Sequence, residues 1–140
     1  MSRGHRLLLV DDDPALRETL GEVLADEGYE LRVASNGREA LQALDGWRPD
    51  LVILDLMMPE MGAYAFRALQ RQRQADPSPV LVLSASPALP TAGADLDAVA
   101  VVGKPFRLQD LLDLIGRILG GGARARPGGE ARGQQPSGPA

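Results

Sequence analysis

Four apolar residues, Leu51 to Leu54, run directly into a single carboxylate, Asp55. A short apolar run between polar flanks is typical of a buried strand in the middle of a parallel sheet. In open α/β sheets, ligands bind in the crevice at the carboxyl ends of the strands. Asp55 is therefore predicted to face a crevice rather than open solvent, as a nucleophile that the rest of the chain serves.

Strand and helix patterns alternate along the chain. The predicted strands are Arg6–Val10, Glu30–Ala34, Leu51–Leu54, Val80–Leu83 and Val99–Val102. The predicted helices run from Pro14 to Gly28 with Asp13 as cap, from about Arg38 to Gly46, from Gly62 to the polar stretch 71–76, and from Leu108 to Leu119. Pro87, Pro90 and Gly93 predict that the fourth helix is short or distorted. Five strands alternating with helices predict an α/β fold, a doubly wound parallel sheet with helices on both faces. Glu30–Ala34 alternates polar and apolar residues, which indicates the half-exposed edge strand.

Polar residues follow the strands at one predicted edge of the sheet, because right-handed crossovers bring the carboxyl ends together. Asp11 and Asp12 end the first strand, Asp55 the third and Ser84 the fourth, while Lys104 follows the fifth. Crowded carboxylates repel and have raised pKa values unless a cation joins them. Mg²⁺ suits oxygen ligands, and the absence of His and Cys from this set argues against zinc. Lys104 and Ser84 could hold phosphoryl oxygens, and aspartyl phosphates are known covalent intermediates.

Composition limits the class of protein. A chain of 140 residues is enough for one domain, and its net charge of −4 gives no basic surface for nucleic acid. There is no cysteine. No apolar run approaches a membrane span or a signal peptide, so we expect a cytoplasmic protein with no membrane partner. We predict a domain over residues 1–119 and a disordered Gly-, Pro- and Arg-rich tail over residues 120–140.

Four motifs carry a family resemblance. They are Leu8–Pro14, Val52–Pro59, Leu83–Ala85 and Gly103–Phe106, and at their spacing they resemble a bacterial two-component response-regulator receiver domain over roughly residues 6–119. The resemblance implies a flavodoxin-like sheet with strand order 2-1-3-4-5. It also implies a stand-alone protein like the chemotaxis regulators, since nothing after Leu119 is expected to form an output domain.

The resemblance also implies site roles. Asp55 would be the phosphoacceptor, charged by a sensor histidine kinase or phosphotransfer protein. Asp12 and Asp55 would bind Mg²⁺ through their side chains and Met57 through its backbone carbonyl, with Asp11 assisting. Lys104 would pair with the phosphoryl group, and the Lys104–Pro105 bond would be cis. Ser84 would shift toward the phosphate and carry the conformational signal.

The chain departs from the family pattern in three places. Val101 stands where the last strand usually has Tyr or Phe, the aromatic half of the switch. The loop after Pro59 reads Gly62-Ala63 in place of Asp-Gly, which predicts either strain at Ala63 or a turn re-formed with Gly62. The fourth helix is the third departure. Elsewhere, the side chains of Met57, Met58 and Trp47 are expected to pack in or near the core.

Three hypotheses remain open. The first is a phosphorylatable receiver that signals in trans to an unknown downstream protein, as a monomer or a weak phosphorylation-linked dimer, and is not an enzyme beyond its own phosphorylation and dephosphorylation. The second is a non-switching receiver, a scaffold or phosphate sink, which Val101 and the irregular 85–97 stretch favour. The third is a Mg²⁺-dependent phosphohydrolase, although Ala15 stands where such enzymes tend to have Thr or Val.

Overall fold

A computed structural model describes residues 4–58, 61–85 and 92–120 of the chain. The chain divides into two compact units. One spans residues 3–106 and holds the whole sheet; the other combines residues 1–2 with residues 107–140. The second unit contains one described helix, α5 (Leu108–Gly120), at the place where the apolar stripe predicts the last helix. Residues 121–140 of the predicted tail lie outside the described residues.

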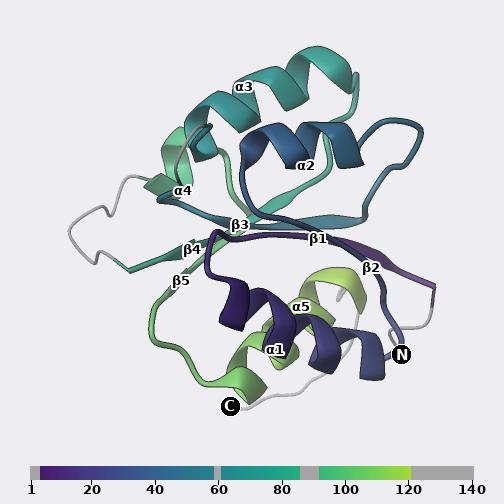
Figure 1. Ribbon diagram of the computed structural model, residues 1–140, viewed down its shortest axis with the longest axis vertical. Coiled ribbons are helices and arrows are strands. Elements are labelled where there is room, and N and C mark those ends of the chain that lie inside the picture. Colours follow the sequence, from purple (N-terminus) through teal and green to yellow (C-terminus); the bar gives the residue numbers. More distant parts are fainter. Residues whose placement is uncertain (1–3, 59–60, 86–91, 121–140) are drawn as a thin grey trace. The chain divides into compact units, whose positions relative to one another are not determined.

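The sheet has five parallel strands in the order β2-β1-β3-β4-β5, as predicted (Figure 1). The strands are β1 (Arg6–Val10), β2 (Glu30–Ala34), β3 (Leu51–Asp55), β4 (Val80–Ser84) and β5 (Ala100–Gly103). Every residue of β3 and β4 is buried, whereas the edge strand β2 is largely exposed. The register pairs Asp55 with Leu83 and Ser84 with Gly103, so the polar ends of β3, β4 and β5 lie at the same edge.

Helices cover both faces of the sheet in the unit formed by residues 3–106. Helix α1 (Pro14–Asp26) lies on one face, and α2 (Gly37–Ala43) and α3 (Ala63–Arg73) lie on the other (Figure 1). The side chain of Asp13 accepts from the Ala15 N–H and caps α1, as predicted. Helix α4 (Ala92–Asp95) is a single turn, so the fourth helix is short in the described residues.

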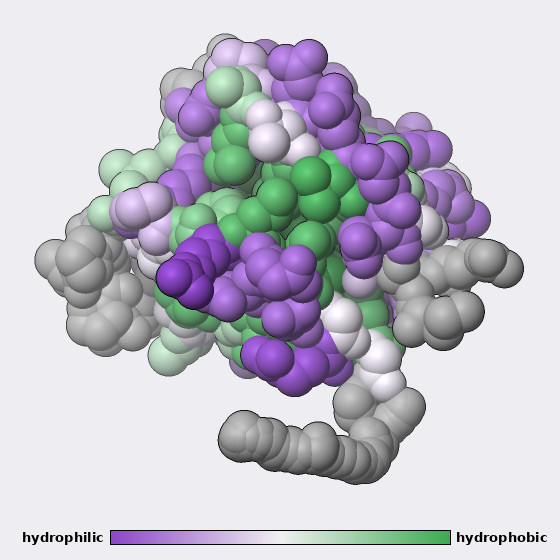
Figure 2. Space-filling view, turned by 90° about the horizontal axis from the view of Figure 1, so that it is seen from below, coloured by the Kyte–Doolittle hydropathy of each residue, from purple (hydrophilic) through white to green (hydrophobic). Residues whose placement is uncertain are grey.

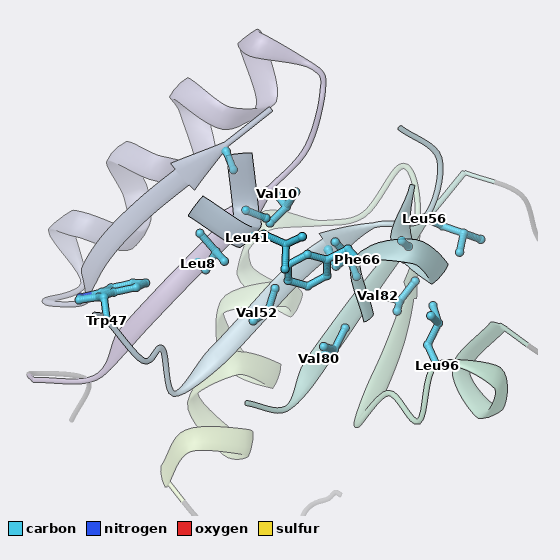
Figure 3. Close-up of a cluster of buried hydrophobic side chains, with 14 residues drawn as sticks. Leu8, Val10, Leu41, Trp47, Val52, Leu56, Phe66, Val80, Val82 and Leu96 are labelled. Carbon is cyan, nitrogen blue, oxygen red and sulfur yellow. The ribbon is translucent and has the colours of Figure 1, made fainter. Parts of the chain in front are cut away.

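The core beneath α2 and α3 is built from the apolar residues of the strands. Figure 3 shows Phe66 lying over the sheet beside Leu41 and Val52, with Trp47 at one end of the cluster and Leu96 at the other. Side chains of this size each contribute roughly 1.5–3 kcal/mol when they are fully buried. The strands β1, β3 and β4 carry almost no polar residue before their last position. Burial of their apolar residues therefore determines the position at which each strand reaches the edge of the sheet.

One charged residue lies inside this core, and its position was not anticipated. Arg67 on α3 is 5% exposed. Its guanidinium donates to the carbonyls of Leu96 and Ser78 over 2.9 and 3.0 Å, to Gln70 Oε1 over 2.8 Å and to the carbonyl of Asp97 over 3.3 Å. Arg67 therefore joins α3 to the segment between α4 and β5.

Several local predictions were wrong. Helix α2 ends at Ala43 rather than near Gly46, and β5 begins at Ala100, one residue later than predicted. For the loop after Pro59, the structure agrees with the second of the two predicted outcomes: Gly62, with φ of −82°, is the N-cap, and Ala63 is the unstrained first residue of α3. The side chain of Met57 does not pack in the core, since it is 65% exposed, because it belongs to the loop that leaves the sheet after Asp55.

Two packing predictions were confirmed. Met58 is partly buried against the core, and Trp47 is 6% exposed. The indole N–H of Trp47 donates to Glu30 over 3.0 Å, and the guanidinium of Arg32 stacks on its ring. The polar residues of the edge strand therefore cover an aromatic ring instead of only facing solvent.

The surface mixes polar and apolar residues, as in most folded domains. Figure 2 shows hydrophilic residues directly beside a hydrophobic area on the face that it displays. Among the helices of residues 4–58, 61–85 and 92–120, none has both the length and the apolar character needed to cross a membrane.

Candidate functional site

Three carboxylates meet where β1 and β3 end. One carboxylate oxygen from each of Asp11, Asp12 and Asp55 lies within 4.8 Å of the others. Asp11 is fully buried and Asp55 is 5% exposed, whereas Asp12 is exposed. The apolar strands place these residues, because β1 and β3 are neighbours and both stop being apolar at the same edge. The convergence that the sequence predicts for these three residues is present.

Lys104 joins the carboxylates from the loop after β5. Its Nζ lies 2.9 Å from Oδ2 of Asp11 and 3.4 Å from Oδ1 of Asp55. The ammonium is partly buried, so water screens these two contacts less than it screens surface ion pairs. The Lys104–Pro105 bond is cis, as the resemblance implies.

The site holds more negative than positive charge. Burial and the neighbouring Asp11 carboxylate raise the pKa of Asp55 to about 6, although Lys104 and the Met57 N–H oppose the shift. Burial alone would lower the pKa of Lys104, but the hydrogen bond to Asp11 and the charges of Asp11 and Asp55 raise it overall. One ammonium therefore does not balance the carboxylates that surround it.

The remaining predicted residues lie at different distances from this centre. Ser84 is buried at the end of β4, one residue beyond the register partner of Asp55. The backbone N–H of Met57 points back to Asp55 Oδ1 over 3.4 Å. Val101 lies away from the carboxylates, in the middle of β5 with its side chain 47% exposed.

The donor set fits a hard divalent cation. It offers oxygen ligands from three carboxylates, and burial, with the neighbouring Asp11 charge, raises the pKa of Asp55. Mg²⁺ takes one or two carboxylates together with water and phosphate oxygens. Within the described residues, those that could hold it are Asp11, Asp12 and Asp55.

One residue beside the site was missed by the sequence interpretation. Nη1 of Arg17, on α1, donates to the backbone carbonyl of Asp11 over 2.7 Å. The backbone N–H of Asp13 donates to Asp11 Oδ1 over 2.9 Å. The available signal was a cation one turn into the helix that follows the acidic loop, but the same pattern also describes an ordinary solvated arginine.

Comparison with known proteins decides the family. The sequence profile described as the response regulator receiver domain matches residues 7–116. The chain belongs to the response regulator receiver domain family. Among curated relatives, the response regulator MprA of Mycolicibacterium vanbaalenii is 42% identical over 116 residues, and MprA of Mycobacterium leprae is 40% identical over the same length. Each alignment covers 81% of this chain and 50% of the relative.

Solved structures of receiver domains agree with the fold. The response regulator TrrA of Thermotoga maritima, solved in complex with Mg²⁺ and BeF, is 33% identical with a TM-score of 0.71. The chemotaxis regulator CheY4 of Vibrio cholerae is 34% identical with a TM-score of 0.73. Both comparisons cover 81% of this chain and 98% of the other. The receiver fold of these proteins is the flavodoxin-like fold seen here.

The lengths of the relatives differ from the length of this receiver domain. The chain spans about half the length of the curated relatives that it matches. The identity of the domain is therefore established, whereas the output of the whole protein is a separate question.

Proposed function

We propose that this receiver domain accepts a phosphoryl group on Asp55, in a Mg²⁺-dependent transfer from a sensor histidine kinase or phosphotransfer protein, in the cytoplasm. The signal then passes by contact with another protein in trans. The observation that carries the proposal is the meeting of Asp11, Asp12 and Asp55 with Lys104 at one edge of the sheet. Membership of the receiver family supports the phosphohistidine donor.

The proposed transfer uses groups that are already in place. An Asp55 carboxylate oxygen attacks phosphorus, the P–N bond to the donor imidazole breaks, and its electron pair returns to that nitrogen. The product is an acyl phosphate on Asp55 and a histidine free of phosphate. Lys104, 3.4 Å from Asp55, is close enough to pair with an oxygen of the transferred group. Ser84, at the end of β4, is the proposed hydroxyl for another oxygen and the proposed switch residue.

A bound Mg²⁺ would offset the repulsion among the carboxylates and shield charge on the transferring oxygens. Asp12 and Asp55 are the proposed side-chain ligands, with Asp11 assisting and the Met57 carbonyl completing the protein's share. The TrrA structure, a related receiver solved in complex with Mg²⁺ and BeF, supports a Mg²⁺ site in this domain.

To reach Asp55, the donor protein must contact the surface around the site. A groove of about 470 Å³ beside Lys104 is lined mainly by apolar residues, including Leu16, Pro105 and Phe106. A donor that reaches Asp55 past this groove would match it best with an apolar contact.

Intact mass after incubation with Mg²⁺ and a small acyl phosphate tests the acceptor chemistry. We expect one added phosphoryl group, which is absent in Asp55→Asn and absent when a chelator removes Mg²⁺. We also expect single transfer rather than steady turnover of a phosphomonoester, which would instead favour a phosphohydrolase. No label on a folded, Mg²⁺-binding protein would refute the proposal.

A non-switching receiver is the second candidate, and the α4–β5 region favours it. Val101 has no ring to move, and a Cβ atom placed on Gly93 would come within 2.7 Å of its Cγ2. Arg67 and Arg71 both donate to the carbonyl of Leu96, just after α4. Amide exchange over residues 84–103, with and without a phosphoryl analogue, separates the candidates: a change in protection supports the switch, and no change supports the scaffold.

A further inference from the structure

Asp11 is held at four points, and one of them is a side chain on α1. Its N–H donates to the Ala34 carbonyl over 3.1 Å, and its two carboxylate oxygens accept from the Asp13 N–H and from Lys104. Its carbonyl accepts from Arg17 over 2.7 Å. Asp11 is fully buried, and within residues 4–58, 61–85 and 92–120 the donor to this carbonyl is Arg17.

That carbonyl belongs to the peptide unit that joins Asp11 to Asp12. If ψ of Asp11 changed so that this carbonyl reached water, every later part of the chain would turn with it. The Asp12 side chain would then change direction, and the Asp13 N–H would leave the Asp11 carboxylate that it now holds. Arg17 therefore acts on two of the three carboxylates through a single hydrogen bond, without touching either carboxylate.

Arg17 also borders the neighbouring loop between β2 and α2. There, Glu39 accepts from the N–H and the hydroxyl of Ser35, each over 2.7 Å. These bonds, with the charge of Arg17 as a smaller contribution, lower the pKa of Glu39. The guanidinium thus has an anionic neighbour besides the acidic site.

We propose that Arg17 is a positioning residue that fixes the Asp11–Asp12 peptide and so aims both carboxylates before a cation binds. This inference rests on the proposed function, in which these carboxylates bind Mg²⁺. It has a distinctive consequence. A nearby positive charge should by itself weaken the binding of a divalent cation, whereas a positioning role should strengthen it, so the two effects have opposite signs.

Calorimetric titration with Mg²⁺ separates these roles. We expect Arg17→Met to weaken Mg²⁺ binding roughly ten-fold, as is usual when a group that orients a metal ligand is removed. Arg17→Lys keeps the charge and one possible donor. The Mg²⁺ affinity of this variant should fall between that of the wild type and that of Arg17→Met. The matched control is Arg32→Met, which removes a similar 2.9 Å bond to the Ala43 carbonyl, outside the site, and should leave Mg²⁺ affinity unchanged.

A second readout needs no metal. In Mg²⁺-free buffer, the amides of residues 12 and 13 should exchange faster in Arg17→Met than in the wild type, and no faster in Arg32→Met. Unchanged or tighter Mg²⁺ binding in Arg17→Met, with unchanged exchange, would overturn the inference alone. A wild-type protein that binds no Mg²⁺ would overturn the metal part of the proposed function, and the inference with it.

Discussion

Two parts of the molecule bury charge, and they do so in opposite ways. The Arg67 guanidinium, on α3, has four acceptors, three of them backbone carbonyls. The carboxylates of Asp11 and Asp55 are buried to a similar extent, but they repel each other and share one ammonium, that of Lys104. The first cluster is complete as it stands, and the second has an excess of negative charge.

The difference separates a structural group from a functional one. Burial lowers the pKa of Arg67, with the charge of Arg71 adding to the effect, yet its neutral acceptors compensate for lost hydration without help from a ligand. Burial raises the pKa of Asp55 to about 6, and a cation at the site would relieve that cost. Groups with strongly shifted pKa values are common at functional sites. Of Arg67 and Asp55, only Asp55 lacks a complete set of partners.

The largest effect on stability should come from breaking the complete cluster. Arg67→Met keeps an unbranched side chain but leaves the carbonyls of Ser78, Leu96 and Asp97 without that donor. We expect the free energy of unfolding to fall by about 3 kcal/mol, measured by urea denaturation. Phosphoryl labelling below the unfolding transition should be unaffected.

The control for this prediction is Arg73→Met on the same helix. Arg73 is exposed at the end of α3, and its replacement should change the free energy of unfolding by less than about 0.5 kcal/mol. A similarly small change in Arg67→Met would show that the buried network contributes little to stability.

A substitution in the cluster of Asp11 and Asp55 should instead raise the free energy of unfolding. Without Mg²⁺, Asp55→Asn removes a repelling charge at nearly constant volume, and we expect unfolding at pH 7.5 to cost about 1–2 kcal/mol more. The folded carboxyl has the higher pKa, so between pH 4 and about 6 the folded state binds more protons than the unfolded state. The penalty from ionised Asp55 therefore grows as pH rises, and the advantage of Asp55→Asn should shrink below about pH 6. A destabilised Asp55→Asn at pH 7.5 would contradict this account.

Mg²⁺ should stabilise the protein through the second cluster alone. At ten times its dissociation constant, a ligand that binds only the folded state adds about 1.4 kcal/mol. We expect this gain in the wild type and in Arg67→Met, and a smaller one in Asp12→Asn, measured as the shift in urea midpoint. Equal gains in all three proteins would place the cation elsewhere.

The order of elements was predictable because the apolar runs are unambiguous. Runs such as Leu51–Leu54 and Val80–Leu83 can be buried on both sides only in a central strand, and the polar residue that follows each run marks the edge of the sheet. The meeting of Asp11, Asp12, Asp55 and Lys104 follows from that topology.

The burial of Arg67 and the exposure of Met57 were not predicted, because they depend on three-dimensional contacts that the sequence pattern does not contain. Arg67 lies on the buried face of α3 with Ala63, Phe66 and Gln70, at helical spacing, and its burial depends on carbonyls distant in sequence. The sequence interpretation gave Arg67 no role. The exposure of Met57 depends on how the loop leaves β3, which residue type alone does not determine.

Locating the phosphoryl group tests the central claim most directly. After labelling with Mg²⁺ and an acyl phosphate, borohydride reduction would trap the modified carboxyl, and fragment masses would assign it. The account predicts modification of Asp55, in the tryptic fragment that ends at Arg67. Modification of Asp11 or Asp12, in the fragment that ends at Arg17, would contradict it, because these carboxylates would then be acceptors rather than ligands for the cation.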